Sequence, residues 1–188
     1  MRRSLIAWTA LLLALVSLLA ACGERRADAD PDPGGSGQPS DDPAMAITGY
    51  IVETKGTGIL VTGSVRKDFS ANGGASHYFD AVWFSDAGSG LEIGQKVRVW
   101  STGEIAESYP GQGKAKRVEV LEPAKPDGAG MTEAEAIRRA LEAAEVDEVM
   151  APSVQAAEYD AANGVWRVEI AWNGKADTVV VEVPDRET

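Results

Sequence analysis

The chain has a single cysteine, Cys22, so it cannot form an intramolecular disulfide. Any folded part must therefore gain its stability from a hydrophobic core alone, even in an oxidising compartment. The chain has 188 residues, of which 44% are hydrophobic and 25% charged, which is enough for one or two small globular domains. We therefore expect small, well-packed units and a separate role for Cys22.

The first 22 residues have the pattern of an export signal. Arg2 and Arg3 precede an apolar run from Leu5 to Ala21 that ends in small residues, as secretory signals do. The run is short for a transmembrane helix, which needs about 20 apolar residues. We predict a signal peptide at residues 1–21. The alternative is an uncleaved anchor with an incidental cysteine.

The junction Leu19-Ala20-Ala21-Cys22 resembles the lipobox of bacterial lipoproteins. The resemblance implies that diacylglycerol is attached to the sulfur of Cys22 and that the signal peptide is removed just before it. The new amino group is then often acylated, and palmitate is among the chains expected. Two or three acyl chains anchor a protein stably, whereas one holds it only marginally. We therefore expect the protein on the outer face of the cell membrane, anchored in the lipid bilayer through acylated Cys22.

The negative charge of the chain limits the classes of partner that it is expected to bind. Without Arg2 and Arg3, 16 basic residues stand against 29 acidic ones, a net charge of −13. We expect no nucleic acid partner, because phosphate binding needs an excess of Lys and Arg. Anionic headgroups would also repel the chain, so a covalent lipid is needed for membrane attachment.

Residues 23–43 contain no large apolar side chain, are rich in Gly, Pro, Ser and Asp, and carry a net charge of −4. Such a segment cannot bury enough surface to fold, and self-repulsion extends it. We predict a lipidated cysteine and disordered acidic linker at residues 22–44, which spaces the folded part from the bilayer. A docking motif is the alternative.

Residues 45–123 predict five short strands separated by turn signals, at 46–53, 58–63, 78–84, 95–100 and 115–121. The last two alternate apolar and charged residues, which is typical of strands with one buried face. Five short strands suggest a small barrel, and an OB-like β-barrel is our first choice. Closure of a barrel also removes exposed strand edges that would aggregate.

Several short patterns in this region carry a family resemblance. They are Gly49 with Ile51, Ile59 to Val61, Gly94 with Val97, Val99 and Trp100, and Ser108-Tyr109-Pro110 followed by Ala115. On these residues the region is similar to the YobA-like family of uncharacterised envelope proteins of Gram-positive bacteria. Because that family has no assigned biochemical function, the resemblance implies a fold and a compartment but no activity.

Residues 128–188 predict a helix followed by three strands. Thr132 and Glu135 have the spacing of a capping box. An apolar stripe then marks a helix at 132–145, formed by Ile137, Ala140, Leu141 and Ala144. Strands are expected at 154–159, 165–172 and 178–183, with turns at Asn163-Gly164 and Asn173-Gly174. The fold class is therefore mainly β (α+β), an OB-like barrel followed by an αβββ module.

The helix sequence resembles that of the PepSY family of small exported modules. The matching residues are Thr132, Glu135, Ala136, Ile137, Ala140 and Leu141. The terminal D-A-x-T-G signature of that family is absent, which puts its proposed peptidase-inhibitory role in doubt here. A generic αβββ unit is the alternative.

Candidates for chemistry are few. His77 is the only histidine, so a metal or thiol site cannot be completed by a second histidine or thiol. Ser76 is adjacent, but a Ser–His pair needs a third group and an oxyanion hole. We expect no catalytic residues, no metal and no cofactor.

Two groups of charged residues are open to more than one interpretation. Acidic residues gather near the predicted helix, where a solvated face is favoured over a calcium site because no calcium-loop pattern is present. The barrel region carries five basic residues that could share a face with Tyr109 and Trp100, namely Lys96, Arg98, Lys114, Lys116 and Arg117. They read as a face of mixed charge or as a patch for a cell-wall polyanion or a protein carboxylate.

The function we expect is a non-enzymatic binding or regulatory module for another envelope protein. One alternative is an envelope sensor that binds a small molecule or a cation. A third reading, an envelope hydrolase, is the least favoured because the inventory of nucleophiles and bases is so small.

Overall fold

The computed structural model describes residue 42 and residues 45–144 and 151–186. The predicted signal peptide, the lipobox residues Leu19, Ala20, Ala21 and Cys22, and most of the predicted linker lie outside the described residues. All described elements belong to one compact unit that spans Gly37–Thr188. Among the described residues, no helix is long and apolar enough to cross a membrane.

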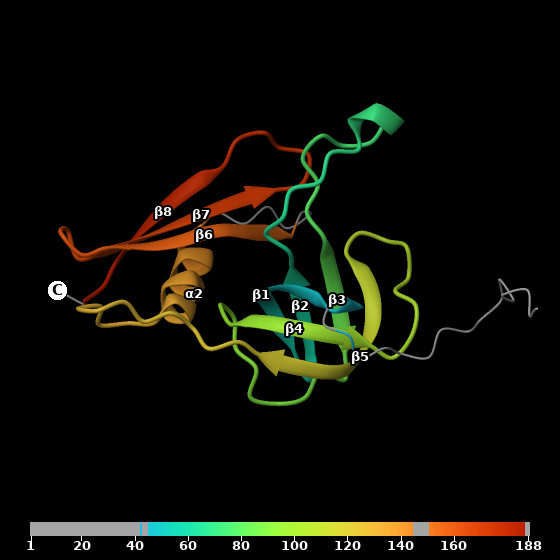
Figure 1. The fold of residues 1–188 in the computed structure, drawn as a ribbon, viewed down its shortest axis with the longest axis horizontal. Helices are drawn as coiled ribbons and strands as arrows, with labels where there is room; N and C mark the ends of the chain where they lie inside the picture. The colour runs from blue at the N-terminus through green and yellow to red at the C-terminus, as the bar shows by residue number, and fades with distance from the viewer. Residues whose placement is uncertain (1–41, 43–44, 145–150, 187–188) are drawn as a thin grey trace, which may run out of the picture. The chain divides into compact units, whose positions relative to one another are not determined.

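The first five strands close into a barrel (Figure 1). They are β1 (Ile47–Lys55), β2 (Gly58–Thr62), β3 (Ala81–Ser85), β4 (Lys96–Ser101) and β5 (Gly111–Val120). Their order around the barrel is β1-β2-β3-β5-β4. β1 pairs with both β2 and β4, and β3 runs parallel to β5. The predicted five-stranded OB-like barrel is confirmed.

Two strands of the barrel begin three or more residues from their predicted starts. The strand predicted at 78–84 begins at Ala81, because Tyr78 instead forms an isolated bridge with Lys67 in the long loop after β2. That loop also contains a short 3-10 turn, η2 (Ser70–Asn72). β5 begins at Gly111 rather than at residue 115. Its first residues include two glycines with little strand propensity, so the alternation of side chains could not show them.

The inside of the barrel is a closed apolar core. Alternate residues of the strands point inward, and most are less than 2% exposed. The inward residues are Ile51, Ile59, Val61, Val82, Phe84, Val97, Val99 and Ala115. The alternation of apolar and polar residues in these strands therefore reflects side chains that point in turn to the inside and the outside of the barrel.

The second part of the compact unit is a helix packed on a three-stranded antiparallel sheet. The elements are α2 (Glu133–Ala143), β6 (Pro152–Asp160), β7 (Val165–Trp172) and β8 (Val179–Pro184), and the sheet order is β6-β7-β8. α2 contacts all three strands. The predicted capping box is present, with Thr132 N–H donating to Glu135 Oε2 at 2.7 Å and Glu135 N–H donating to Thr132 Oγ1 at 3.3 Å. The predicted αβββ module is confirmed.

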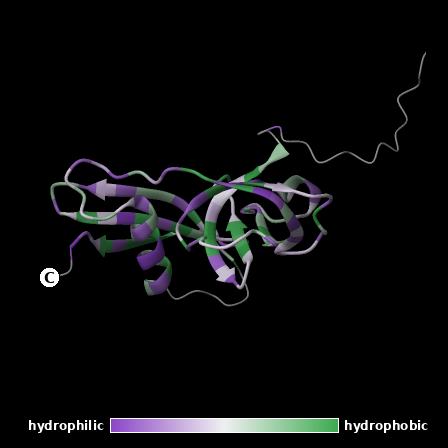
Figure 2. Cartoon of the chain, turned by 90° about the horizontal axis from the view of Figure 1, so that it is seen from below, coloured by the Kyte–Doolittle hydropathy of each residue, from purple (hydrophilic) through white to green (hydrophobic). Residues whose placement is uncertain are grey.

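A second apolar core joins the barrel to this module. Tyr50, Val52, Leu60 and Ala81 point away from the barrel interior and are buried at 9% exposure or less. They belong to one cluster with buried residues of α2 and the sheet, among them Ile137, Ala140, Val154, Trp166 and Ile170. Figure 2 shows apolar residues along the strands of both the barrel and the sheet. β1 and β2 are therefore buried on both faces.

Candidate functional site

The outer face of β2 and β3 is the surface on which OB barrels hold oligonucleotides and oligosaccharides. In this chain the second module covers it. Leu60 on β2 and Ala81 on β3 are 5% and 3% exposed and share a core with Val154 on β6. Two hydrogen bonds of 2.6 Å seal the contact, from Ser64 Oγ to the Val154 carbonyl and from Ser153 Oγ to the Gly63 carbonyl. The usual OB ligand surface is thus an internal surface of the compact unit.

The turn after β7 fixes the segment that precedes β3. The side chain of Asn173 accepts a hydrogen bond from Phe79 N–H and donates one of 3.2 Å to the Phe79 carbonyl. Gly174 N–H donates to the His77 carbonyl at 2.8 Å. Asn173 is buried, so these bonds satisfy polar groups that would otherwise lose their hydration. The backbone at residues 77–79 therefore has a structural role.

The His77 ring has two polar neighbours. Its Nδ1 lies 3.0 Å from Ser76 Oγ, and its Nε2 lies 3.5 Å from Arg66 Nη1. A Ser–His catalytic pair needs a carboxylate that orients the imidazole and stabilises its charged form. Here the neighbour of Nε2 is a guanidinium rather than a carboxylate. The predicted absence of a catalytic role for His77 remains a prediction, and this geometry agrees with it.

Three aromatic rings connect the loop after β2 with the loop before β5. Phe69 and Tyr78 meet edge to face at 5.3 Å, and Tyr78 and Tyr109 do so at 6.0 Å. Burial, with smaller contributions from Tyr78 and Asp80, raises the pKa of Tyr109 to about 12. Its hydroxyl therefore stays neutral at physiological pH. The stack holds the two loops together, although Phe69 is 42% exposed.

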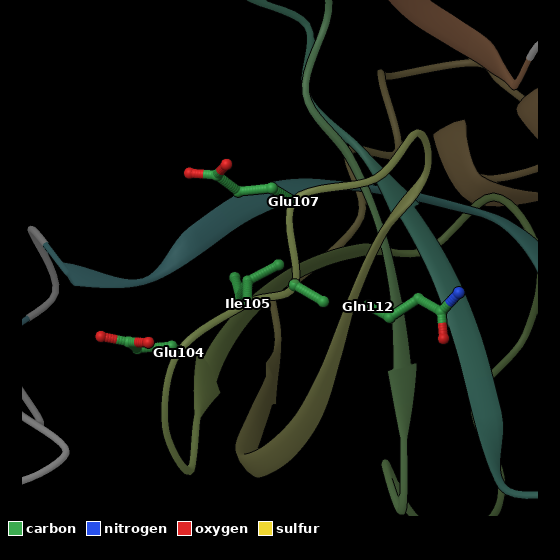
Figure 3. Close-up of a pocket in the computed structure, with 5 residues that line it drawn as sticks. Glu104, Ile105, Glu107 and Gln112 are labelled. Carbon is green, nitrogen blue, oxygen red and sulfur yellow. The ribbon is translucent and has the colours of Figure 1, made fainter.

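A pocket opens on the loop between β4 and β5 (Figure 3). It has a volume of about 680 Å³ and is lined by Glu104, Ile105, Ala106, Glu107 and Gln112. This volume is in the range of small-molecule sites. In Figure 3 the Glu104 and Glu107 side chains extend to the same side, while Gln112 extends from β5 on the other. Two carboxylates on one side of the pocket suit a small cation with donor groups.

Ile105 lines this pocket and also packs against the apolar core of the barrel. A Cβ added to Gly111 would lie 3.0 Å from Ile105 Cγ2, and one added to Gly113 would lie 3.3 Å from Ile105 Cγ1. The side chain thus packs directly over the glycines of β5. The sequence interpretation did not single out Glu104, Glu107 or Gln112. The sequence feature that could have indicated this pocket is the polar loop of nine residues, 102–110, between two predicted strands.

The five basic residues considered for a patch are engaged on the barrel. Arg98 and Arg117 both contact the Glu119 carboxylate at 3.4 Å, and Lys114 contacts Asp86 at 2.9 Å. Lys96 lies over the Tyr50 ring at 5.1 Å. Lys116 is also on β5 and has an interaction of its own. The structure favours the reading of a face of mixed charge.

The two aromatic residues considered with that patch lie in different surroundings. Tyr109 packs on Tyr78, and Trp100 is covered by the Arg117 guanidinium at 4.5 Å. The Trp100 indole N–H also donates a 3.0 Å hydrogen bond to the carbonyl of Asp42. Met45 N–H donates to the same carbonyl at 2.9 Å. The chain that enters the barrel is thus fixed to it at Asp42.

Two of the acidic residues near α2 have structural partners. Glu133 contacts Tyr50 and the backbone of Ala124, and Glu135 caps the helix. The hydrogen bonds from Thr132 lower the pKa of Glu135. Glu145, Asp147 and Glu148 lie outside the described residues. Among the residues that the structure describes, no three His, Cys, Asp or Glu side chains come together as a metal site would require.

Part of the chain matches a known protein family. Residues 48–122 match the model of the family described as "Protein of unknown function (DUF3221)". The match begins in β1 and ends just after β5, so it covers the barrel. It also covers most of the region that resembles the YobA-like family, whereas the lipobox and the PepSY-like helix lie outside it. No curated protein and no solved structure matches the chain.

Proposed function

We propose that this protein is a lipid-anchored module on the outer face of a bacterial membrane that binds or regulates another envelope protein without catalysing a reaction. The observation that carries the proposal is Cys22, the only cysteine, which follows Leu19-Ala20-Ala21 at the end of an apolar leader. A chain with so strong a negative charge needs a covalent lipid to stay at an anionic bilayer.

The position of Asp42 defines the tether that this proposal requires. Because Asp42 is fixed to Trp100, the tether runs from Cys22 to Asp42, which is 42 − 22 = 20 residues. For the disordered linker predicted from the sequence, that length corresponds to a root-mean-square extension of about 25 Å and a maximal reach of about 70 Å. The folded part would therefore work close to the membrane, within reach of other membrane-bound proteins.

The described side chains support a binding role more than a catalytic one. His77 lies beside a guanidinium, Glu133 and Glu135 hold the start of α2, and Asp185 is bonded to backbone N–H groups. The OB ligand face is covered by the chain's own sheet. The surfaces left for a partner are the loops at the ends of the barrel, the β4–β5 face and the β6–β8 sheet.

Lipid attachment can be tested by labelling bacteria that produce the full chain with a palmitate analogue. We expect the label and the membrane location in the natural chain and in a Ser17→Ala control, and neither in Cys22→Ser. The mass of the native protein should show acyl chains on a new N-terminal Cys22. A bare thiol, or a leader that is still attached, would refute the anchoring.

The binding role can be tested by crosslinking in intact cells. The natural chain and Cys22→Ser should be compared at equal amounts, and the captured species identified by mass spectrometry. Recurrent capture of one envelope protein by the anchored chain supports the proposal. Capture of no protein under conditions in which the lipid label is present would contradict it.

A second candidate function is an envelope sensor for a small cation, and the pocket beside Ile105 is the observation that favours it. The probes are spermidine and Ca²⁺ added to the full chain, with melting temperature as the readout, because a ligand that binds the folded state raises it. A rise that is lost in Glu104→Gln/Glu107→Gln but kept in Glu53→Gln, a control on β1, would support the sensor. No rise with either probe would reject it for these cations.

A further inference from the structure

Strand β8 forms one edge of the β6-β7-β8 sheet. In the part of the chain that the structure describes, β8 pairs with β7 and with no other strand. An edge strand presents unpaired backbone N–H and C=O groups that another strand can use. Two adjacent valines, Val179 and Val180, are 47% and 56% exposed on this strand. The edge therefore combines open backbone groups with exposed apolar side chains.

The register of β7 and β8 shows which backbone groups point outward. Asp185 N–H donates to the Gly164 carbonyl at 3.0 Å, and Val181 lies opposite Val168 in the same ladder. In an antiparallel pair the hydrogen-bonded positions alternate. Val179, Val181 and Val183 therefore bond to β7, whereas Val180, Glu182 and Pro184 direct their backbone groups away from it.

Pro184 agrees with this assignment, because a proline in a sheet lies where the missing N–H would face outward. The outward edge thus has two donors, the N–H groups of Val180 and Glu182, and an acceptor beside each of them. These two residues lie symmetrically about Val181. An antiparallel strand that matches the edge must offer two donors and two acceptors with the same spacing.

We propose that β8 is a self-association edge at which two copies of this chain pair antiparallel about Val181. In this register Val180 of one copy and Glu182 of the other exchange N–H···O bonds, which gives four bonds in all. Exposed Val179 then lies opposite Val183 of the second copy. The paired sheets form one six-stranded sheet with two unpaired edges, both from β6.

The charges on β8 favour a second copy as the occupant. Glu182 is the one charged residue of the strand, and its carboxylate is already paired with Arg167 Nε at 3.1 Å. The register about Val181 sets Glu182 opposite Val180, so no two carboxylates face each other. Shifting the register to bring Glu182 opposite itself would set like charges side by side, which is unfavourable. The strand is thus complementary to itself in one register.

Cysteine crosslinking tests both the pairing and its register. The full chain with Cys22→Ser has no other cysteine, so Val181→Cys can form a disulfide only between copies. Residues directly opposite at a non-hydrogen-bonded position have Cα atoms about 4.5 Å apart, which a disulfide can span. Mild oxidation should give a dimer band on a non-reducing gel. Glu158→Cys, at an exposed position on β6 in the same background, is the control and should give a much weaker band.

Two further substitutions distinguish a disulfide formed by β8 pairing from one formed by random encounters between copies. Val180→Pro removes an outward donor from each copy, two of the four bonds, and leaves the β7–β8 ladder intact. It should reduce the Val181→Cys dimer at least about tenfold. Val180→Glu places a second carboxylate opposite Glu182 and should reduce the dimer in low salt, with recovery in high salt.

Thermal melting of each variant shows whether the fold is kept. Equal crosslinking of Val181→Cys and Glu158→Cys would overturn the proposal. Crosslinking of Val181→Cys that Val180→Glu leaves unchanged in low salt would overturn it as well, and this second test holds even if Val180→Pro disturbs the strand.

Discussion

The Tyr50 hydroxyl donates a 2.6 Å hydrogen bond to Oε1 of Glu133, and this bond joins a barrel strand to the first residue of α2. Burial, followed by the Glu133 carboxylate, raises the pKa of Tyr50, so the hydroxyl stays a donor. The other carboxylate oxygen of Glu133 accepts from Ala124 N–H at 3.2 Å. One carboxylate thus connects the barrel, the linking segment and the helix.

Tyr50→Phe should lower the free energy of unfolding by about 1–2 kcal/mol, because it removes one of the two hydrogen-bond donors of a partly buried carboxylate. Urea denaturation of the full chain measures the change. Tyr109→Phe is the matched control. It keeps the ring on Tyr78, and we expect a change below about 0.5 kcal/mol. Equal losses in the two variants would contradict the role given to the bond.

Ile137→Ala should destabilise the barrel and the αβββ module together. Ile137 is fully buried in the core that both parts share, so the cavity should cost about 2–5 kcal/mol. Hydrogen exchange at β2 and at β7 should then accelerate by the same factor. Val180→Ala, at an exposed position, should change neither rate. Faster exchange in β7 alone would show that the two parts unfold separately.

The shared core explains what the sequence could and could not predict. Strands β4 and β7 and the capped helix follow from local signals, namely alternation, turn residues and the Thr132–Glu135 spacing. The parallel pairing of β3 with β5 joins distant segments, and no local pattern encodes it. The sequence does contain a feature that indicates burial of the outer face of β1 and β2. Tyr50-Ile51-Val52 and Ile59-Leu60-Val61 are continuous apolar runs, which indicate burial on both faces of a strand.

Gly94→Ala should be much more harmful than Gly90→Ala. Both glycines have positive φ, 92° and 79°, so an alanine costs about 1–2 kcal/mol of backbone strain at either position. At Gly94 the added Cβ would also overlap the Ala134 carbonyl of α2, whereas a Cβ added at Gly90 would meet no non-neighbouring atom within 4 Å. We expect Gly94→Ala to cost at least about 2 kcal/mol more, measured by urea denaturation. Equal costs would place α2 farther from the barrel.

Asp185 should make the stability depend on pH. Its carboxylate accepts from Gly130 N–H at 2.6 Å, Met131 N–H at 3.0 Å and Trp166 Nε1–H at 3.3 Å. These bonds, that of Gly130 first, lower the pKa of Asp185. A folded pKa below the unfolded value of about 3.9 gives stability that is present above that pH and lost as the pH falls through the folded pKa.

The comparison of Asp185→Asn with the natural chain isolates this contribution. The variant should melt at a lower temperature near pH 7, and the difference should shrink below about pH 4 as the natural carboxylate takes up a proton. Asp177→Asn, at an exposed position before β8, should show no such trend. A difference that stays constant down to about pH 2 would mean that shape, rather than charge, governs this position.

The covered face of β2 and β3 changes how mutational data on this chain should be read. A scan guided by other OB proteins would concentrate on Leu60, Ala81 and Trp83, and losses of function there would look like lost ligand contacts. In this chain those positions are interior or pack against the shared core, so such losses would report misfolding. Recognition has to be sought on the rest of the surface, with folding measured alongside every variant.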